Sequence, residues 1–203
     1  MRVIIIAGGS YSPCIKFLTD DYVICADSGF DSAVKCGITP SLVLGDMDSV
    51  KGDISLFPDT KVYPARKDFT DTELALETAI DLKPDEIIIL GALGNRTDHS
   101  LANIFLLKRA FDAGIKACIC DEHNKVYYYK NSFILKNCVG KTVSLIPVTE
   151  EITGLVTKGL DYPLCNESIL FGQTRGISNV VTGEEASYTS QKGEGILVVS
   201  DGI

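Results

Sequence analysis

The stretch 42-LVLGDMDSV-50 determines the fold and raises the question of function. It opens with a short apolar run, typical of a buried strand, and closes on Gly45 and two aspartates, Asp46 and Asp48, one residue apart. Burying two neighbouring carboxylates without partners costs on the order of several kcal/mol. The pair therefore lies in a solvated turn or holds a cation, and the D-x-D spacing alone does not decide between these readings.

The same plan, an apolar run closed by glycine or acidic residues, recurs along the first part of the chain. The other copies are RVIIIAGG (2–9), DYVICADSG (21–29), DEIIILGALG (85–94) and IKACICDE (115–122). Helical patterns lie between them, one opening with Thr70 and Glu73 at capping-box spacing and one ending at Gly114. Alternating strands and helices predict a mostly parallel sheet with helices on both faces, with the polar strand ends gathered on one edge.

After residue 123 the pattern changes to short β-type runs separated by glycine, asparagine or charges. No long helical stretch intervenes, so this part predicts an antiparallel β-sandwich or barrel. The expected organisation is an α/β domain over residues 1–123, followed by an all-β sandwich domain over residues 124–203.

Composition restricts the class of protein. The chain has 203 residues, of which 45% are apolar. Its formal charge of −8 argues against nucleic acid or an anionic membrane as a partner. Seven cysteines without a C-x-x-C motif, and only two histidines, do not form a zinc pattern. The apolar run at residues 3–7 is too short for a signal peptide or a membrane span, so we expect a cytoplasmic protein. Neither a P-loop nor a G-x-S-x-G motif is present.

Two further clusters follow predicted strands. RKDFTDTELA (66–75) crowds cationic and acidic residues at a helix start, and GALGNRTDHSLAN (91–103) joins a strand to a helix through glycines. Helix capping by Asp98 or Ser100 and dipole stabilisation of Asp71 account for part of this pattern. They do not account for three charged clusters at one edge of a sheet, an arrangement expected of an active site that handles phosphate and metal.

Five motifs together resemble the thiamine pyrophosphokinase family, in that family's order and over nearly the whole chain. They are ADSG (26–29), LGDMDS (44–49), KDFTDTELAL (67–76), GNRTDHSLAN (94–103) and GLDYPL with ILFGQTRGISN (159–164 and 169–179). The resemblance implies transfer of the pyrophosphoryl group of ATP to the hydroxyl of thiamine, giving thiamine diphosphate and AMP, with Mg²⁺. It also implies that residues 1–123 form the nucleotide- and metal-binding catalytic domain and residues 124–203 the thiamine-binding and dimerisation domain, in a homodimer whose active sites lie at the subunit interface.

The resemblance carries roles to particular residues. It implies an acidic metal and phosphate site made of Asp27, Asp46, Asp48 and Asp71. It implies thiamine contacts from Asp98 and, through the partner subunit, from Ser178 and Asn179. Candidates for nucleotide contacts are Ser28, Arg66, Lys67, Asp68 and Arg96. Lys67 stands where some relatives carry glutamine, and the chain lacks the tryptophan that some relatives place against the thiamine pyrimidine.

The residues leave some alternatives open. Either Asp71 or Asp98 accepts the proton of the attacking alcohol. A pyrophosphokinase for another alcohol, such as a hydroxymethylpterin, would use the same N-terminal chemistry and differ at Ser178 and Asn179. A non-catalytic nucleotide-sensing module would bind nucleotide without releasing AMP.

Overall fold

The computed structural model describes residues 1–9, 14–52 and 59–201. The chain divides into two compact units, Met1–Glu122 and His123–Ile203. Within the described residues, no helix is both long and apolar enough to cross a membrane.

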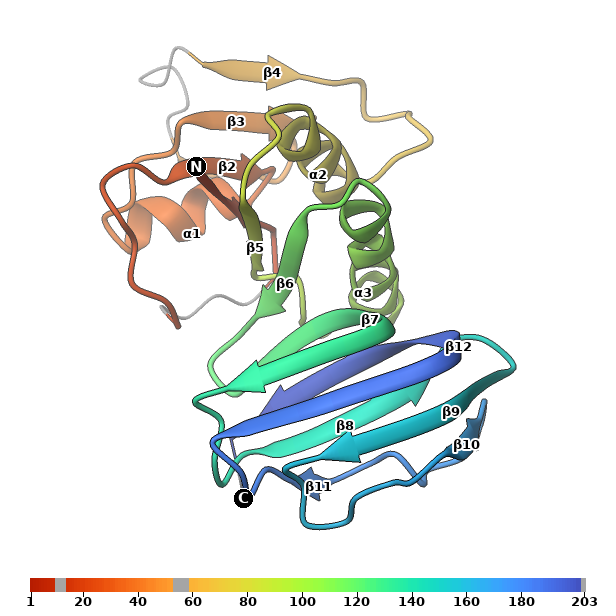
Figure 1. Ribbon diagram of the computed structural model, residues 1–203. Coiled ribbons are helices and arrows are strands. Elements are labelled where there is room, and N and C mark those ends of the chain that lie inside the picture. Colours follow the sequence, from red (N-terminus) through yellow and green to blue (C-terminus); the bar gives the residue numbers. More distant parts are fainter. Residues whose placement is uncertain (10–13, 53–58, 202–203) are drawn as a thin grey trace. The chain divides into compact units, whose positions relative to one another are not determined.

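The first unit is built on a parallel sheet (Figure 1). Its strands are β1 (Arg2–Ile6), β2 (Tyr22–Ala26), β3 (Leu42–Gly45), β4 (Thr60–Val62), β5 (Glu86–Leu90) and β6 (Lys116–Cys120). Their order is β6-β5-β1-β2-β3-β4, and every neighbouring pair is parallel. The five strands predicted from apolar runs are confirmed; β4, a short edge strand, was not predicted.

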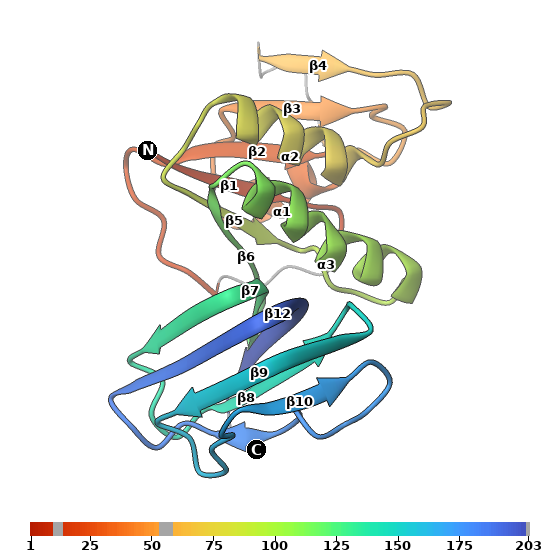
Figure 2. The same cartoon turned by 45° about the vertical axis from the view of Figure 1, so that its right-hand side comes forward.

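Helices cover both faces of this sheet, as predicted. They are α1 (Gly29–Lys35), α2 (Asp71–Asp81) and α3 (Thr97–Asp112). Because crossovers between parallel strands are right-handed and the chain reverses its direction across the sheet after β4, α2 and α3 lie together on one face and α1 on the other (Figures 1 and 2). Of the capping box predicted for α2, the Thr70 half forms: its hydroxyl accepts a hydrogen bond from the Glu73 backbone N–H at 3.2 Å, while the Glu73 carboxylate pairs with Arg109.

Helix α3 also forms as predicted and is followed by Gly114 in the left-handed conformation, with φ of +74°. Its buried face differs from the one that its large apolar residues suggest. Asn103, Leu107 and Ala110 are buried, whereas Leu101 and Phe105 are about half exposed, at 49% and 53%. A polar residue therefore occupies the inner face of this helix.

The second unit is an antiparallel β-sandwich, as predicted. Its strands are β7 (Asn124–Lys136), β8 (Thr142–Pro147), β9 (Glu151–Lys158), β10 (Glu167–Leu170), β11 (Asn179–Val180) and β12 (Glu185–Ser200). β12 pairs with β7 along nearly its whole length, with β9 over its first half and with β8 over its second half. The irregularity between Thr189 and Glu194 separates these halves, so one long strand serves both layers of the sandwich. The core between the layers includes Tyr129, Val143 and Leu197.

Candidate active site

A cleft of about 460 Å³ opens at the carboxyl ends of β1, β2 and β5. It is lined by the turns that follow these strands, by the first residues of α2 and by the start of α3. The crossovers on either side of β1 run in opposite directions, so the cleft lies at the point where parallel α/β sheets bind their ligands. The structure therefore confirms the prediction that the polar strand ends gather on one edge of the sheet.

Two glycine turns form one wall of the cleft. The Gly9 backbone N–H donates to the carbonyl oxygen of Gly91 at 2.8 Å. A Cβ atom at Gly9 would lie 2.3 Å from that oxygen, and Gly91 itself has φ of +64°. Only glycine allows the two turns to come this close, which leaves bare backbone facing the cleft, as sites for phosphate groups require.

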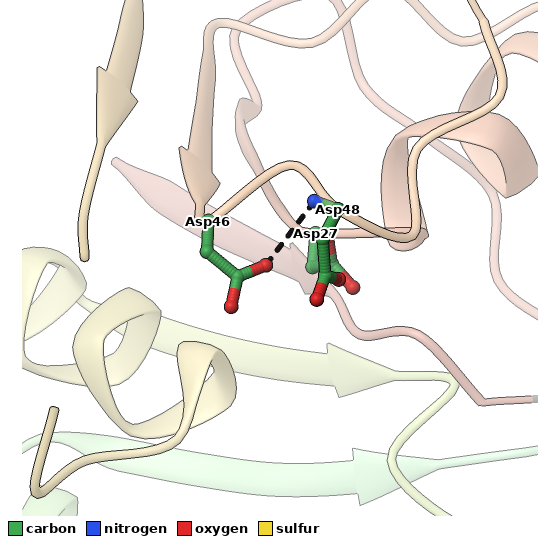
Figure 3. Close-up of side chains that lie close together, drawn as sticks. All are labelled: Asp27, Asp46 and Asp48. Atoms are coloured by element: carbon green, nitrogen blue, oxygen red, sulfur yellow. Dashed lines mark hydrogen bonds between the residues drawn. The ribbon is translucent and has the colours of Figure 1, made fainter. Parts of the chain in front are cut away.

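Three of the predicted acidic residues converge beside this cleft (Figure 3). Asp27 follows β2, Asp46 and Asp48 follow β3, and one carboxylate oxygen from each lies within 4.8 Å of the others. The Asp48 backbone N–H donates to Asp46 Oδ1 at 3.2 Å, which closes a tight turn around Met47. Like charges at this spacing repel, so the arrangement is unfavourable without a cation.

The pKa of the Asp27 carboxyl is perturbed chiefly by its burial, and this repulsion adds to the effect. Burial raises the pKa of the Asp27 carboxyl above its usual value, and the neighbouring charges of Asp71 and Asp46 raise it further. Hydrogen bonds from the Ser28 backbone and the Ser49 side chain oppose the shift. Asp27 Oδ1 is buried and accepts no hydrogen bond within the described part of the chain. A carboxylate oxygen held this way lacks the partner that a cation would supply.

Lys67 enters the same cluster from the loop before α2. Its Nζ lies 3.0 Å from Asp71 Oδ1 and 3.8 Å from Asp46 Oδ2, and its side chain is only 12% exposed. Asp71 lies close to Asp27 as well, since a Cβ on Gly45 would come within 3.1 Å of Asp71 Oδ1 and 3.2 Å of Asp27. The predicted fourth acid is therefore at the cluster, but it is engaged by a lysine and is not one of the three converging carboxylates.

The remaining charged candidates are exposed. Among the described residues neither Arg66 nor Asp68 forms an ion pair, although both lie in the loop that carries Lys67. Arg96 donates to both carboxylate oxygens of Asp98, at 2.9 and 2.6 Å, and this pairing holds the pKa of Asp98 below its usual range. Asp98 does not cap α3, because the residue at the cap position is Arg96 and no side-chain cap bond forms there.

Two further residues shape the cleft: Asn103, which the sequence analysis did not single out, and Ser100, which it considered only as a helix cap. Buried Asn103 donates from Nδ2 to the Ala92 carbonyl oxygen at 2.8 Å. One turn earlier on α3, the Ser100 hydroxyl accepts from the Gly94 backbone N–H at 3.1 Å and donates to the Arg96 carbonyl oxygen at 3.0 Å. These contacts fix the glycine turn after β5. The only sequence signal for the role of Asn103 was a polar residue at an inward position of the helix.

The second unit contains a separate cavity of about 470 Å³, lined in part by Tyr162, Arg175, Ser178 and Asn179. The Asn179 side chain holds the backbone of Tyr162 at both ends: Oδ1 accepts from the Tyr162 N–H at 3.0 Å and Nδ2 donates to the Tyr162 carbonyl oxygen at 2.7 Å. The Tyr162 side chain is 70% exposed. Ser178 is exposed and has φ of +59°.

Comparison with known proteins places the chain in a family. Residues 17–119 match the family profile described as thiamin pyrophosphokinase, catalytic domain, and residues 131–193 match thiamin pyrophosphokinase, vitamin B1 binding domain. The chain belongs to the thiamine pyrophosphokinase family. The thiamine pyrophosphokinase of Bacillus subtilis (strain 168) is 34% identical to it over 207 residues, covering 97% of each chain.

Solved thiamine pyrophosphokinase structures share this fold over the full length. The structure from Bacillus subtilis superposes with a TM-score of 0.91 at 31% identity and covers all of both chains. That from Geobacillus thermodenitrificans gives a TM-score of 0.89 at 29% identity and covers 100% of this chain and 98% of its own. The resemblance drawn from the five motifs is thereby confirmed at the level of the family.

Proposed function

We propose that the chain is an ATP-dependent thiamine diphosphokinase, which transfers the pyrophosphoryl group of ATP to the hydroxyl of thiamine and releases AMP. The observation that carries the proposal is the convergence of Asp27, Asp46 and Asp48 beside a glycine-walled cleft, in a chain of the thiamine pyrophosphokinase family. In this reaction the alcohol oxygen attacks the β-phosphorus, a new P–O bond forms there, and the bond between the β-phosphorus and the oxygen bridging to the α-phosphate breaks.

The acidic cluster suits Mg²⁺. All donors are carboxylate oxygens, which Mg²⁺ prefers, and the buried Asp27 Oδ1 has no other partner among the described residues. We assign Asp27, Asp46 and Asp48 as the residues that hold the metal, with Asp71 close by. When bound, the metal neutralises charge on the phosphates and on the leaving AMP.

The chain's own residues position the substrates. The backbone turns around Gly9 and Gly91 accommodate the nucleotide phosphates. Ser28 and Arg96 line this cleft, and Arg66, Lys67 and Asp68 lie in the loop before α2; all five are candidate contacts. Asp71 or Asp98 takes the proton from the attacking hydroxyl. Charge balance and orientation, rather than covalent participation of the protein, supply the catalysis.

We assign thiamine recognition to Asp98 and to Ser178 and Asn179 of the sandwich unit, within a homodimer whose active sites are completed by the partner subunit. The cavity beside Ser178 has a volume within the range of small-molecule sites. A mixed dimer of an Asp46→Asn chain and a Ser178→Ala/Asn179→Ala chain tests the sharing of sites. One working site per dimer is expected, and its absence after confirmed subunit exchange would mean that each site is built from one chain.

The deciding experiment for the reaction is AMP release from ATP and Mg²⁺ with thiamine, with a hydroxymethylpterin and with no alcohol. AMP formed stoichiometrically with thiamine diphosphate is the expected result. AMP formed only with the pterin would reassign the substrate. Nucleotide binding without AMP in any arm would make the protein a nucleotide-binding module.

A further inference from the structure

The Lys67 ammonium occupies an unusual position for a surface-loop lysine. It contacts two of the four clustered aspartates, and its side chain is nearly buried. Within the described residues, no other lysine or arginine forms an ion pair with Asp27, Asp46, Asp48 or Asp71. In the protein without nucleotide, the neutralisation of this cluster therefore depends on a single positive charge that belongs to the chain.

The contact is electrostatic and readily exchanged. Asp71 Oδ1 lies 3.0 Å from Nζ but accepts no hydrogen bond, and the distance to Asp46 Oδ2 is 3.8 Å. A lysine ammonium is a compact charge on a flexible stem, so it moves to a stronger anion without rearranging the backbone. The phosphates of a nucleotide in the neighbouring cleft are such an anion.

We propose that Lys67 is a built-in counter-cation that competes with the divalent metal for Asp46 and so makes metal binding depend on the nucleotide. The inference rests on the proposed function. With the cleft empty, the ammonium neutralises Asp46 and Asp71 and repels a divalent cation. When nucleotide phosphates attract the ammonium, the carboxylates are released to the metal. Metal and nucleotide then each strengthen the binding of the other, as linkage requires.

A purely structural role for Lys67 predicts a different dependence on nucleotide. If the lysine only held the loop in place, its removal would favour the metal through the loss of one nearby positive charge, equally with and without nucleotide. If nucleotide draws the lysine away from the cluster, its removal strengthens metal binding in the empty cleft and lowers the mutual enhancement of metal and nucleotide. The size of that enhancement therefore separates the two roles, whatever the effect of the substitution on turnover.

The test is calorimetric titration of nucleotide-free protein with Mn²⁺, which takes the same oxygen ligands as Mg²⁺. In Lys67→Met we expect Mn²⁺ to bind about tenfold tighter than in the wild type, a factor within the usual range for coupled sites. Lys67→Arg keeps the charge and should resemble the wild type. Lys61→Met, which removes an exposed charge from β4 of the same unit, is the matched control for net charge and should also resemble the wild type.

A second titration measures the coupling. The ATP analogue with a methylene bridge between its α- and β-phosphates cannot react, and Mn²⁺ should enhance its binding more in the wild type than in Lys67→Met. Unchanged or weaker Mn²⁺ binding in Lys67→Met, or equal enhancement in both proteins, would overturn the proposal. If Lys67→Met does not fold, Lys67→Gln carries the same expectations. These titrations contain no thiamine and need no turnover, so a failed AMP assay and a failed Lys67 test are separate results.

Discussion

Asn179 offers the sharpest test of how the sandwich unit builds its cavity. Its Oδ1 accepts from the backbone N–H groups of Tyr162 and Val180, at 3.0 and 2.9 Å, and its Nδ2 donates to the Tyr162 carbonyl oxygen at 2.7 Å. Both lone pairs of the amide oxygen are thus used, and one N–H remains for a ligand. At roughly 0.5–1.5 kcal/mol for each hydrogen bond, Asn179→Ala should cost about 3 kcal/mol of the free energy of unfolding.

The assay combines a melting curve with saturation curves for thiamine and ATP on one preparation. For a chain of this size, about 3 kcal/mol lowers Tm by about 6–12 °C. We expect the thiamine concentration for half-maximal rate to rise, because Tyr162 is no longer held at the cavity, and the ATP dependence to stay constant. The exposed amide of Gln173 in the same unit supplies the control, and Gln173→Ala should leave both unchanged. An unaltered Tm with weakened thiamine use would refute this reasoning and make Asn179 a direct ligand.

Three further predictions concern the aspartates. Asp46→Asn and Asp48→Asn should each lower turnover about a hundredfold, roughly 3 kcal/mol, with the fold intact by circular dichroism; near-normal rates at saturating Mg²⁺ would remove them from the metal site. Asp98→Asn breaks an exposed pair with Arg96, so its Tm should hardly change while half-maximal thiamine rises about tenfold; a large loss of Tm alone would make Asp98 structural. Because the pKa of Asp27 is raised in the folded state, its ionised form lowers stability as pH rises from the ordinary value of 3.8 through the raised one. Asp27→Asn should therefore raise Tm in metal-free buffer at pH 7 and lose that advantage near pH 4; a lower Tm at pH 7 would contradict the assignment.

The central strands were predictable because burial on both faces leaves continuous apolar runs, as in Ile4–Ile6. Strand β4 gave no such signal, since it has three residues on an edge and its middle and last residues, Lys61 and Val62, are exposed. The predicted helix α3 forms, and its buried face includes the polar residue Asn103. Asn103 takes an inward position because the Ala92 carbonyl oxygen pairs with its amide, and a partner so distant in sequence leaves no local pattern.

The sequence predicted which acidic residues form the site, but not how the backbone brings their side chains together. Alternation along an extended strand predicts that Asp46 and Asp48 point the same way. In the structure β3 ends at Gly45, and the two side chains converge through a turn instead. The contact of Lys67 with Asp46 depends on how the loop after β4 returns to the sheet. The position of Asn179 likewise depends on a loop from another part of the sandwich, and short-range patterns carry neither piece of information.

Two residues of the assigned sites adopt an unfavourable backbone conformation. Met47 and Ser178 have φ of 63° and 59°, in the left-handed region that L-residues other than asparagine and aspartate rarely adopt; Lys83 does so away from these sites, and Asp27, with φ of 47°, does so at lower cost. Each such residue costs about 1–2 kcal/mol. At Met47 this conformation turns Asp48 back toward Asp46 and brings together carboxylates that repel each other. Mutual attraction therefore cannot be what sets the geometry of the cluster. It is imposed by β2 and β3, whose side chains are almost fully buried immediately before the strained residues, and their packing offsets both the strain and the repulsion.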